Sequence, residues 1–198
     1  MLYNQLAVIK TEVVNMIRID LDDTFDATTA SEDLKRFTFN SELKDNTNLE
    51  LHVLISEHPD PLLPNVFNLA FGPLGEDNEI DDAIAVRHKN INKVFSTILL
   101  FAITFLEDNS YKQYSIGIDG SDERRAYLYH RMFRYNNDTL MDSIVTVGVD
   151  WYVKLLRNGT DIERDSDGLP LFKPRPEPFD LNRKARDLYR YYMFSLNN

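Results

Sequence analysis

The chain has 198 residues, of which 43% are hydrophobic and 27% charged, and this composition is typical of one globular domain with a substantial core. The absence of cysteine excludes disulfides, cysteine-ligated zinc, iron–sulfur clusters and a thiol nucleophile, and it favours a reducing, cytoplasmic location. The net charge of −10 argues against nonspecific nucleic-acid binding, because affinity for a duplex depends on neutralising its phosphates.

Residues 1–36 are predicted to form an acidic N-terminal extension. No basic-then-apolar leader opens the sequence, and β-branched residues toward Met16–Ile19 favour a strand there. The longest apolar run of the chain, Ile98–Phe105, is far shorter than the ~20 residues that a membrane span needs. We therefore expect a protein that does not associate with a membrane.

Asp20 and Asp22 follow the first apolar segment in an Asp-x-Asp-x-Thr pattern. The pattern resembles the nucleophile loop of the haloacid dehalogenase phosphatases, and the resemblance implies an attacking Asp20, a proton-handling Asp22 and bound Mg²⁺. The residues that follow predict strands and turns instead of the strand–helix alternation of that superfamily. A solvated acidic loop is therefore the preferred interpretation, with the phosphatase as the alternative.

Residues 37–156 are predicted to form an α+β core domain. Helical spacing of apolar residues predicts two helices, at 90–107 with Asn90 as its N-cap and at 121–134. We expect a mostly antiparallel sheet that these helices cover on one face. Apolar runs between turn signals predict its strands at 37–39, 49–56, 65–71, 83–87, 114–118, 144–149 and, as a strand or short helix, 151–156.

No metal or cofactor site is predicted. The carboxylates between Glu76 and Asp82 lack the spacing of an EF-hand, so a solvated hairpin tip explains them better. The four histidines are too scattered along the chain to propose a set of ligands.

The stretch Tyr114–Met132 carries the strongest chemical signal. Strand periodicity ends at Gly120, which allows a turn, and Ser121 is predicted to cap the helix that follows. Helical spacing draws Arg125 onto the inward face of that helix. Backbone N–H groups and a guanidinium at a helix N-terminus are typical of anion recognition, so Gly120, Ser121 and Arg125 form the predicted anion site.

A structural interpretation of Arg125 stays open beside the anion site. In that interpretation Ser121 is only a cap, and Arg125 pairs with Asp81, Asp82 or Asp119. No nucleophile–base pair accompanies the turn, so no catalytic residue is predicted.

Arg124, Tyr127 and Arg131 lie on the opposite face of the same predicted helix. Guanidinium and phenol groups together can stack and pair, which is typical of a partner-binding patch. The acidic background favours a protein partner over nucleic acid.

The end of the chain is predicted to be a loop and Pro-rich spacer at 157–178, followed by a helical tail at 179–196. Arg186, Tyr189 and Arg190 of this tail are further predicted partner-binding residues. The tail is basic and rich in aromatic residues, so we expect it to dock on the acidic N-terminal region or on a second copy. A stiff spacer disfavours folding straight back and therefore favours a homodimer.

Gly120, Ser121, Arg125, Leu128 and Tyr129 match a Gly-Ser-x-x-x-Arg-x-x-Leu-Tyr signature after a strand. The chain resembles a family of small bacterial proteins of unknown function, found mainly in Bacteroidetes, that carries this signature. The upstream portion of the family pattern matches at 65–72 and 80–82, and the resemblance covers roughly 37–153. Tyr127 departs from the family, which tends to carry a second arginine there. The resemblance implies no activity.

Two functions from different classes are consistent with the sequence. The favoured one is a non-enzymatic interaction protein, such as an accessory, immunity or antitoxin-like component, that contacts a protein partner or a second copy. The alternative is a phosphate-ester or nucleotide-binding enzyme or sensor that uses the turn Gly120–Arg125, or Asp20 and Asp22 with magnesium.

Overall fold

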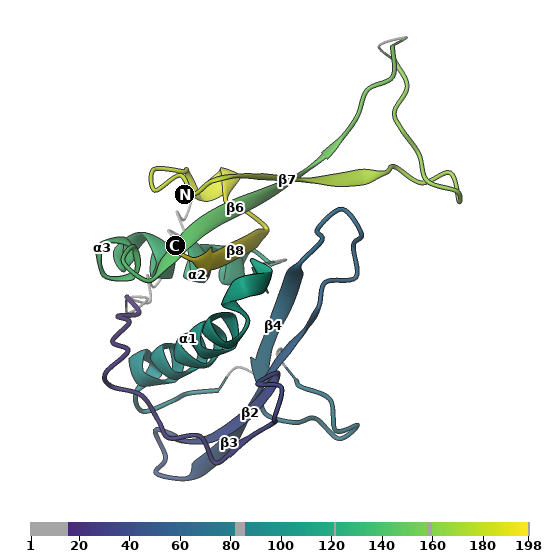
Figure 1. Ribbon diagram of the computed structural model, residues 1–198. Coiled ribbons are helices and arrows are strands. Elements are labelled where there is room, and N and C mark those ends of the chain that lie inside the picture. The colour runs from purple at the N-terminus through teal and green to yellow at the C-terminus, as the bar shows by residue number, and fades with distance from the viewer. Residues whose placement is uncertain (1–15, 82–85, 121, 158–159, 198) are drawn as a thin grey trace, which may run out of the picture.

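A mixed sheet of eight strands runs through the part of the chain that the computed structural model describes, residues 16–81, 86–120, 122–157 and 160–197 (Figure 1). Its strand order is β1-β2-β3-β4-β5-β8-β6-β7, and each neighbouring pair is antiparallel except β4 with β5. The strands are β1 Thr29–Ala30, β2 Arg36–Glu42, β3 Asn48–Glu57, β4 Val66–Gly72, β5 Ser115–Asp119, β6 Ile144–Val153, β7 Phe172–Pro178 and β8 Tyr191–Leu196. The helices are α1 Ile91–Asp108, α2 Glu123–Tyr135 and α3 Asn137–Leu140, with short 3₁₀ turns η1 Ser110–Lys112 and η2 Ala185–Asp187. The predicted α+β class with a mostly antiparallel sheet is confirmed.

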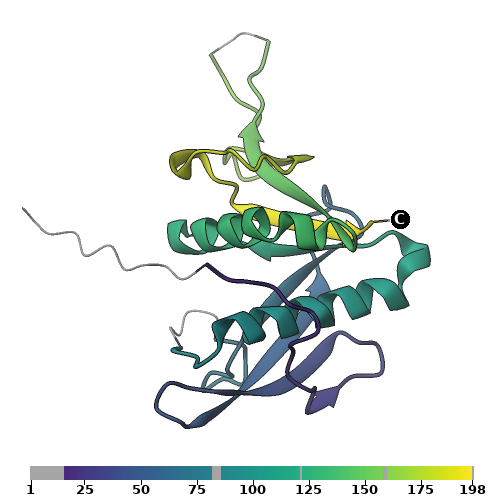
Figure 2. The same ribbon diagram turned by 90° about the vertical axis from the view of Figure 1, so that its left-hand side faces the viewer.

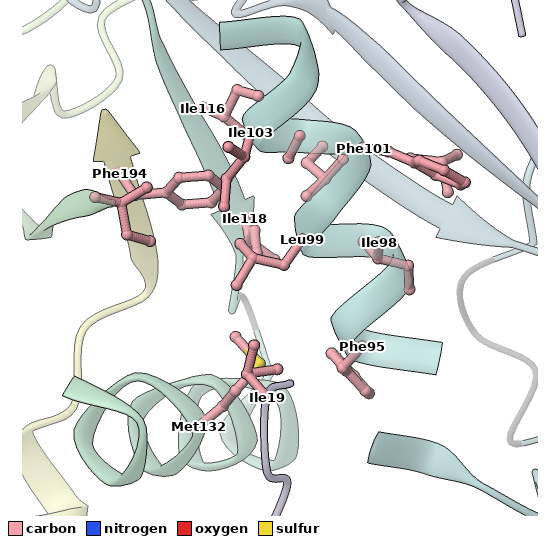
Figure 3. Packing of buried hydrophobic residues seen from close by; sticks show 14 of the residues in the cluster. Ile19, Phe95, Ile98, Leu99, Phe101, Ile103, Ile116, Ile118, Met132 and Phe194 are labelled. Atoms are coloured by element: carbon pink, nitrogen blue, oxygen red, sulfur yellow. The ribbon is translucent and has the colours of Figure 1, made fainter. Parts of the chain in front are cut away.

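The two long helices, α1 and α2, lie on the same face of the sheet, as predicted (Figure 2). Asn90 caps α1, because its side-chain oxygen accepts the N–H of Lys93 at 3.1 Å. Leu99 of α1, Ile118 of β5 and Met132 of α2 belong to one buried cluster, which forms the main core (Figure 3). No helix in the described part of the chain is long and apolar enough to cross a membrane.

The predicted C-terminal helix is wrong, because the end of the chain forms the central strand β8. This strand pairs antiparallel with both β5 and β6. Its sequence, YYMFSL, places apolar side chains on both faces, as expected for a strand that is buried from both sides. Tyr192 and Phe194 are fully buried in the main core. The aromatic tail therefore docks within its own sheet, and the reason for expecting a tail-mediated dimer disappears.

The Pro-rich segment is a strand and not a free spacer. Pro174, Pro176 and Pro178 of β7 pair with Trp151, Val149 and Val147 of β6. β7 is the edge strand of the sheet, and proline in a strand is tolerated at an edge, where its missing N–H is not required. Because the three prolines alternate with other residues, their nitrogens point to the same, outward side. Proline at every second residue is also consistent with a polyproline-like spacer, but here it suits a strand at the edge of the sheet.

Two aromatic rings, one just before β8 and one within it, pack against glycines of the neighbouring strands. A Cβ on Gly117 of β5 would overlap the ring of Tyr191, and a Cβ on Gly148 of β6 would overlap the ring of Tyr189. Both positions must therefore lack a side chain for the rings to approach the backbone. The ring of Tyr189 is completely buried by this packing.

The segment Met16–Ile19 is not a strand, contrary to the prediction. It runs in an extended form beside the helices, with Ile17 and Ile19 buried in the main core. The side-chain amide of Asn136 replaces a strand partner, since it accepts the N–H of Ile19 at 2.8 Å and donates to the carbonyl of Ile17 at 2.9 Å. The strand predicted at 83–87 falls largely on 82–85, which lie outside the described residues.

His130 is the buried titratable group of the α2 side of the core. Its side chain lies among aromatic rings, with Phe179 at a centroid distance of 5.0 Å, and is 3% exposed. Neither ring nitrogen makes a hydrogen bond to another described residue. Burial, and to a lesser degree the charge of Arg134, lowers the pKa of His130 below its ordinary value.

We predict that this buried imidazole makes the fold less stable in acid. Between the lowered pKa of the folded state and about 6.5, the unfolded chain binds a proton that the folded chain does not. The free energy of unfolding should therefore fall as the pH drops below about 6.5, and His130→Leu should flatten that decline. Urea unfolding at several pH values measures it, and an unchanged slope in the variant would contradict the assignment.

Candidate functional site

The sheet splits where its parallel strands diverge. β4 and β5, which α1 connects, pair over three residues only, from Val66 with Ser115 to Asn68 with Gly117. Beyond this point β4 continues alongside β3 and β5 continues alongside β8. A cavity of about 850 Å³ opens at the carboxyl ends of the two strands. This is the edge at which sheets with parallel strands commonly bind ligands.

Alternating residues of four strands bring polar and aromatic groups to this cleft. The residues between them along β4 and β5, such as Leu69 and Ile118, belong to the main core under the helices. The residues that alternate with them therefore point to the opposite side of the sheet. They are Asn68 and Ala70 of β4, Gly117 and Asp119 of β5, Trp151 of β6 and Tyr191 of β8. Because the sheet splits here, the cavity also reaches Leu69 and Ile118 and, from α2, Arg125 and Tyr129.

Charged side chains of both signs line the cleft. Arg125 of α2 and Arg190, the residue before β8, contribute positive charge, and Asp119 contributes a carboxylate. Asp119 and Arg190 are exposed, and neither takes part in an ion pair with any described residue. The carbonyl of Arg190 accepts the N–H of Gly120 at 2.9 Å, which ties this arginine to the turn after β5.

His58 and Tyr191 add neutral groups to the cleft. The N–H of Asp60 donates to His58 Nδ1 at 3.0 Å, so the proton of the neutral ring is on Nε2. Burial lowers the pKa of His58, which keeps the ring uncharged near neutral pH. The hydroxyl of Tyr191 donates to Asn68 Oδ1, and burial raises its pKa. Both side chains are thus fixed, with His58 edge-on to the Tyr191 ring at 5.2 Å.

The predicted anion site is partly rearranged. The N-cap of α2 is Asp122 and not Ser121, and its Oδ1 accepts the N–H groups of Arg124 and Arg125 at 2.8 and 2.9 Å. These amides are already satisfied by a carboxylate, because aspartate is a strong N-cap. Ser121 itself lies outside the described residues. Gly120 is buried at the turn.

Arg125 makes an ion pair and also lines the cavity. Its Nε pairs with Asp122 Oδ2 at 3.0 Å, an aspartate that the prediction did not name, and the predicted partner Asp82 lies outside the described residues. The same side chain lines the cleft from the helix side, which is the location that anion recognition needs. Arg125 is therefore a held guanidinium at the edge of the cavity.

The predicted partner-binding residues come together from distant parts of the chain. Arg131 donates to the hydroxyl of Tyr127 at 3.2 Å on the outer side of α2, and Arg124 beside them is exposed. A second hollow of about 490 Å³ lies between Tyr127 and the η2 region with Arg186 and Arg190.

Tyr189 does not belong to this surface. It is completely buried against β6, so the predicted contact of Tyr189 with a partner is wrong.

The Asp20–Asp22 motif forms a turn. Asp20 Oδ1 accepts the N–H of Asp22 at 3.0 Å, and the neighbouring Asp23 pairs with Lys93 at 2.9 Å. The strand that should precede a phosphatase nucleophile is missing from residues 16–20. Among the residues that the structure describes, no group of three or more His, Asp or Glu is placed to hold a metal ion.

Most of the cleft was not predicted from the sequence. The sequence patterns assign no binding role to Asn68 or Trp151, give Asp119 only as a possible ion-pair partner of Arg125, and place Arg190 on a helix. A signal was present, because Asn68 and Asp119 interrupt otherwise apolar strands on the side away from the core. The divergence of the strands that opens the cavity has no local sequence signal.

The Family of unknown function (DUF6934) matches the chain over residues 22–159. The matched range includes residues 37–153, over which the sequence resembles a family of proteins of unknown function. No curated protein and no solved structure shows a significant match to the chain. The family match ends before β7 and β8, although β8 lies between two strands that the match contains.

We predict that a chain ending at residue 159 does not fold. Without β8, β5 and β6 lose their common partner, and the main core loses Tyr192 and Phe194. Removing large buried side chains costs about 2–5 kcal/mol each, which approaches the whole stability of a typical domain. Circular dichroism during heating should show no cooperative transition, and the chain should aggregate on size exclusion. Cooperative unfolding of the shortened chain would refute the central role of β8.

Proposed function

The chain belongs to the Family of unknown function (DUF6934), and we propose that this member binds a small organic anion in the cleft between β4 and β5. The observation that carries the proposal is the convergence of two arginines from different elements on one cavity. Arg125 reaches it from α2 and Arg190 from the segment before β8. The proposal is one of binding and assigns no catalytic step.

The charges of the cleft favour an anion over a cation. Two guanidinium groups face one carboxylate, Asp119, and both His58 and Tyr191 are held neutral. Guanidinium groups recognise carboxylates and phosphates through paired hydrogen bonds. Arg125 already pairs with Asp122, so Arg190, which makes no ion pair with a described residue, supplies the positive charge left for such a ligand.

The size of the cleft supports a whole small molecule and not a single inorganic ion. Cavities that bury drug-sized ligands usually measure about 300–1,000 Å³, with mostly apolar walls and a few polar groups. The cavity of about 850 Å³ has Leu69, Ile118 and Tyr129 among its apolar and aromatic walls.

The test is a thermal-shift and calorimetric screen of organic phosphates and carboxylates. At a hundred times its dissociation constant, a ligand stabilises the folded state by about 2.7 kcal/mol. Arg190→Ala should weaken binding at least about tenfold, because it removes a charge-assisted contact. The matched control is Arg186→Ala, a nearby arginine whose side chain is 78% exposed, and its affinity should stay that of the wild type. Equal loss in both variants, or a flat screen, would contradict the proposal.

A second function, contact with another protein, is favoured by a projecting hairpin. β6 and β7 continue together beyond the end of β8 and form what we call the arm, residues 150–157 and 160–177 (Figures 1 and 2). Large exposed hydrophobic side chains are concentrated on it. They are Trp151, Tyr152, Leu155, Leu156, Leu169 and Phe172. Exposed apolar side chains gathered on one projection are typical of an interaction surface.

The base of the arm is clamped. Arg183 pairs with Asp150 at 2.5 Å and with Glu177 at 3.1 Å, and its guanidinium lies over the ring of Tyr189 at 3.8 Å. These contacts join both strands of the arm to the segment before β8. The apolar side chains are therefore carried on a fixed projection and not on a free loop.

We propose a second copy of the chain as the occupant of this surface. The arm holds five basic and six acidic residues, so it carries one of the ten net negative charges of the chain. Two copies can therefore approach through their arms with the least electrostatic repulsion. The prolines on the outer edge of β7 prevent sheet extension there, so the contact uses side chains.

Light scattering tests the arm. The wild type should show a mass that rises with concentration toward twice 23.1 kDa, and the double variant Leu155→Ser, Phe172→Ser should remain a monomer. Tyr111→Ser removes a still more exposed aromatic side chain outside the arm and should behave as the wild type. A monomeric wild type at all concentrations would exclude the second copy.

A further inference from the structure

We propose that the organic anion is a nucleoside phosphate, with its base against Trp151, its ribose hydroxyls on Asp119 and its phosphate on Arg190 and Arg125. This inference rests on the proposed function of the same cleft and names the class of its ligand. The three groups of residues come from different strands and a helix, and they meet in one cavity.

The carboxylate of Asp119 is the group that a simple anion does not explain. It is exposed at the carboxyl end of β5 and has no ion-pair partner among the described residues. An ionised carboxylate only accepts hydrogen bonds, and it repels a phosphate or carboxylate ligand. A ligand that fits both Asp119 and the arginines therefore carries hydrogen-bond donors at a distance from its negative charge, as the ribose hydroxyls of a nucleotide do.

The aromatic side of the cleft supplies a surface for a planar ring. Trp151 is 36% exposed on β6 and shares its sheet face with Val149 and Tyr191. The Tyr191 ring lies against Gly117 and packs in an edge-to-face arrangement with His58, so it forms the floor of the cleft. An indole in the wall of a cavity is a common platform for stacking a base.

The two arginines proposed to bind the phosphate are held by contacts within the protein. The ion pair with Asp122 orients the guanidinium of Arg125, and the backbone bond between Arg190 and Gly120 fixes where the second arginine begins. Both lie on the α2 side of the cleft, next to the turn that follows β5. Two guanidinium groups in such positions suit the several oxygens of a phosphate.

An aromatic amino acid also has a ring, an anion and a donor, and it is the main competing ligand. The cavity of about 850 Å³ is near the upper end of the usual range for small-molecule sites, which favours the larger nucleotide. The experiment includes this competitor directly.

Calorimetric titration of the full chain with AMP, ribose 5-phosphate, adenosine and tryptophan tests the inference. AMP should bind at least about tenfold more tightly than ribose 5-phosphate or adenosine, since each of these lacks one contact. Trp151→Leu should weaken the binding of AMP to the level of ribose 5-phosphate and leave the affinity for ribose 5-phosphate unchanged. The control Tyr152→Leu alters the next exposed aromatic residue of β6, which faces the other side of the sheet, and should leave the affinities for AMP and ribose 5-phosphate unchanged.

Asp119→Asn gives a second, independent measurement. It should reduce the preference for AMP over its 2′,3′-dideoxy form, because a carboxylate accepts from both hydroxyls and an amide does so less well. Circular dichroism of each variant confirms that the fold is intact.

The outcomes separate the inference from the proposed function. If ribose 5-phosphate binds as tightly as AMP, the nucleoside inference is wrong and the anion site stands. If tryptophan binds more tightly than AMP, the ligand class is an amino acid and the inference is again wrong. If adenosine binds as tightly as AMP, the phosphate contact is wrong and the anion site is refuted. If none of the four binds, the nucleoside inference is wrong, and the screen of organic phosphates and carboxylates decides the anion site.

Discussion

The rings of Tyr189 and Tyr191 lie against the backbones of Gly148 and Gly117, and this contact determines where β8 enters the sheet. A side chain larger than hydrogen at either glycine would overlap the ring beside it, so the ring or the strand would have to shift. The register of β8 on both neighbours follows, with Phe194 opposite Ile116 on β5. Once β8 is in register, its alternate side chains fill the main core under the helices.

β8 also determines which side chains line the cleft. Because side chains alternate along a strand, burying Tyr192 in the core necessarily turns Tyr191 toward the cleft. Arg190, one residue earlier, is carried to the mouth of the cavity, and Arg183 further upstream fixes the base of the arm. Core, cleft and arm are therefore not independent features, since one C-terminal segment positions all of them.

Sequence patterns predicted the local elements better than their connections. The helix after Asn90 and the meander of β2, β3 and β4 follow from spacing and turn residues alone. The C-terminal segment was read as a helix, because Leu181, Ala185, Leu188 and Tyr192 also fit helical spacing. Only the pairing with β5 and β6, which are distant in sequence, distinguishes the two interpretations. Arg125 could be predicted as a site residue because it lies only a few residues after the turn at Gly120. Arg190 and Asp119 become neighbours only through the pairing of β8 with β5.

The position of β8 also constrains how the protein is made. The middle of the sheet is completed only when β8 has been made, because Phe194 pairs with Ile116 and Tyr191 pairs with Val149. Until then, the nascent chain holds two open strand edges, and such edges are prone to pair with other chains. The meander of β2, β3 and β4 with α1 can form early, because its contacts are local, but the sheet closes only after β8 has been made. The cleft is therefore complete only once β8 has been made, since β8 supplies Tyr191 and the residue before it is Arg190.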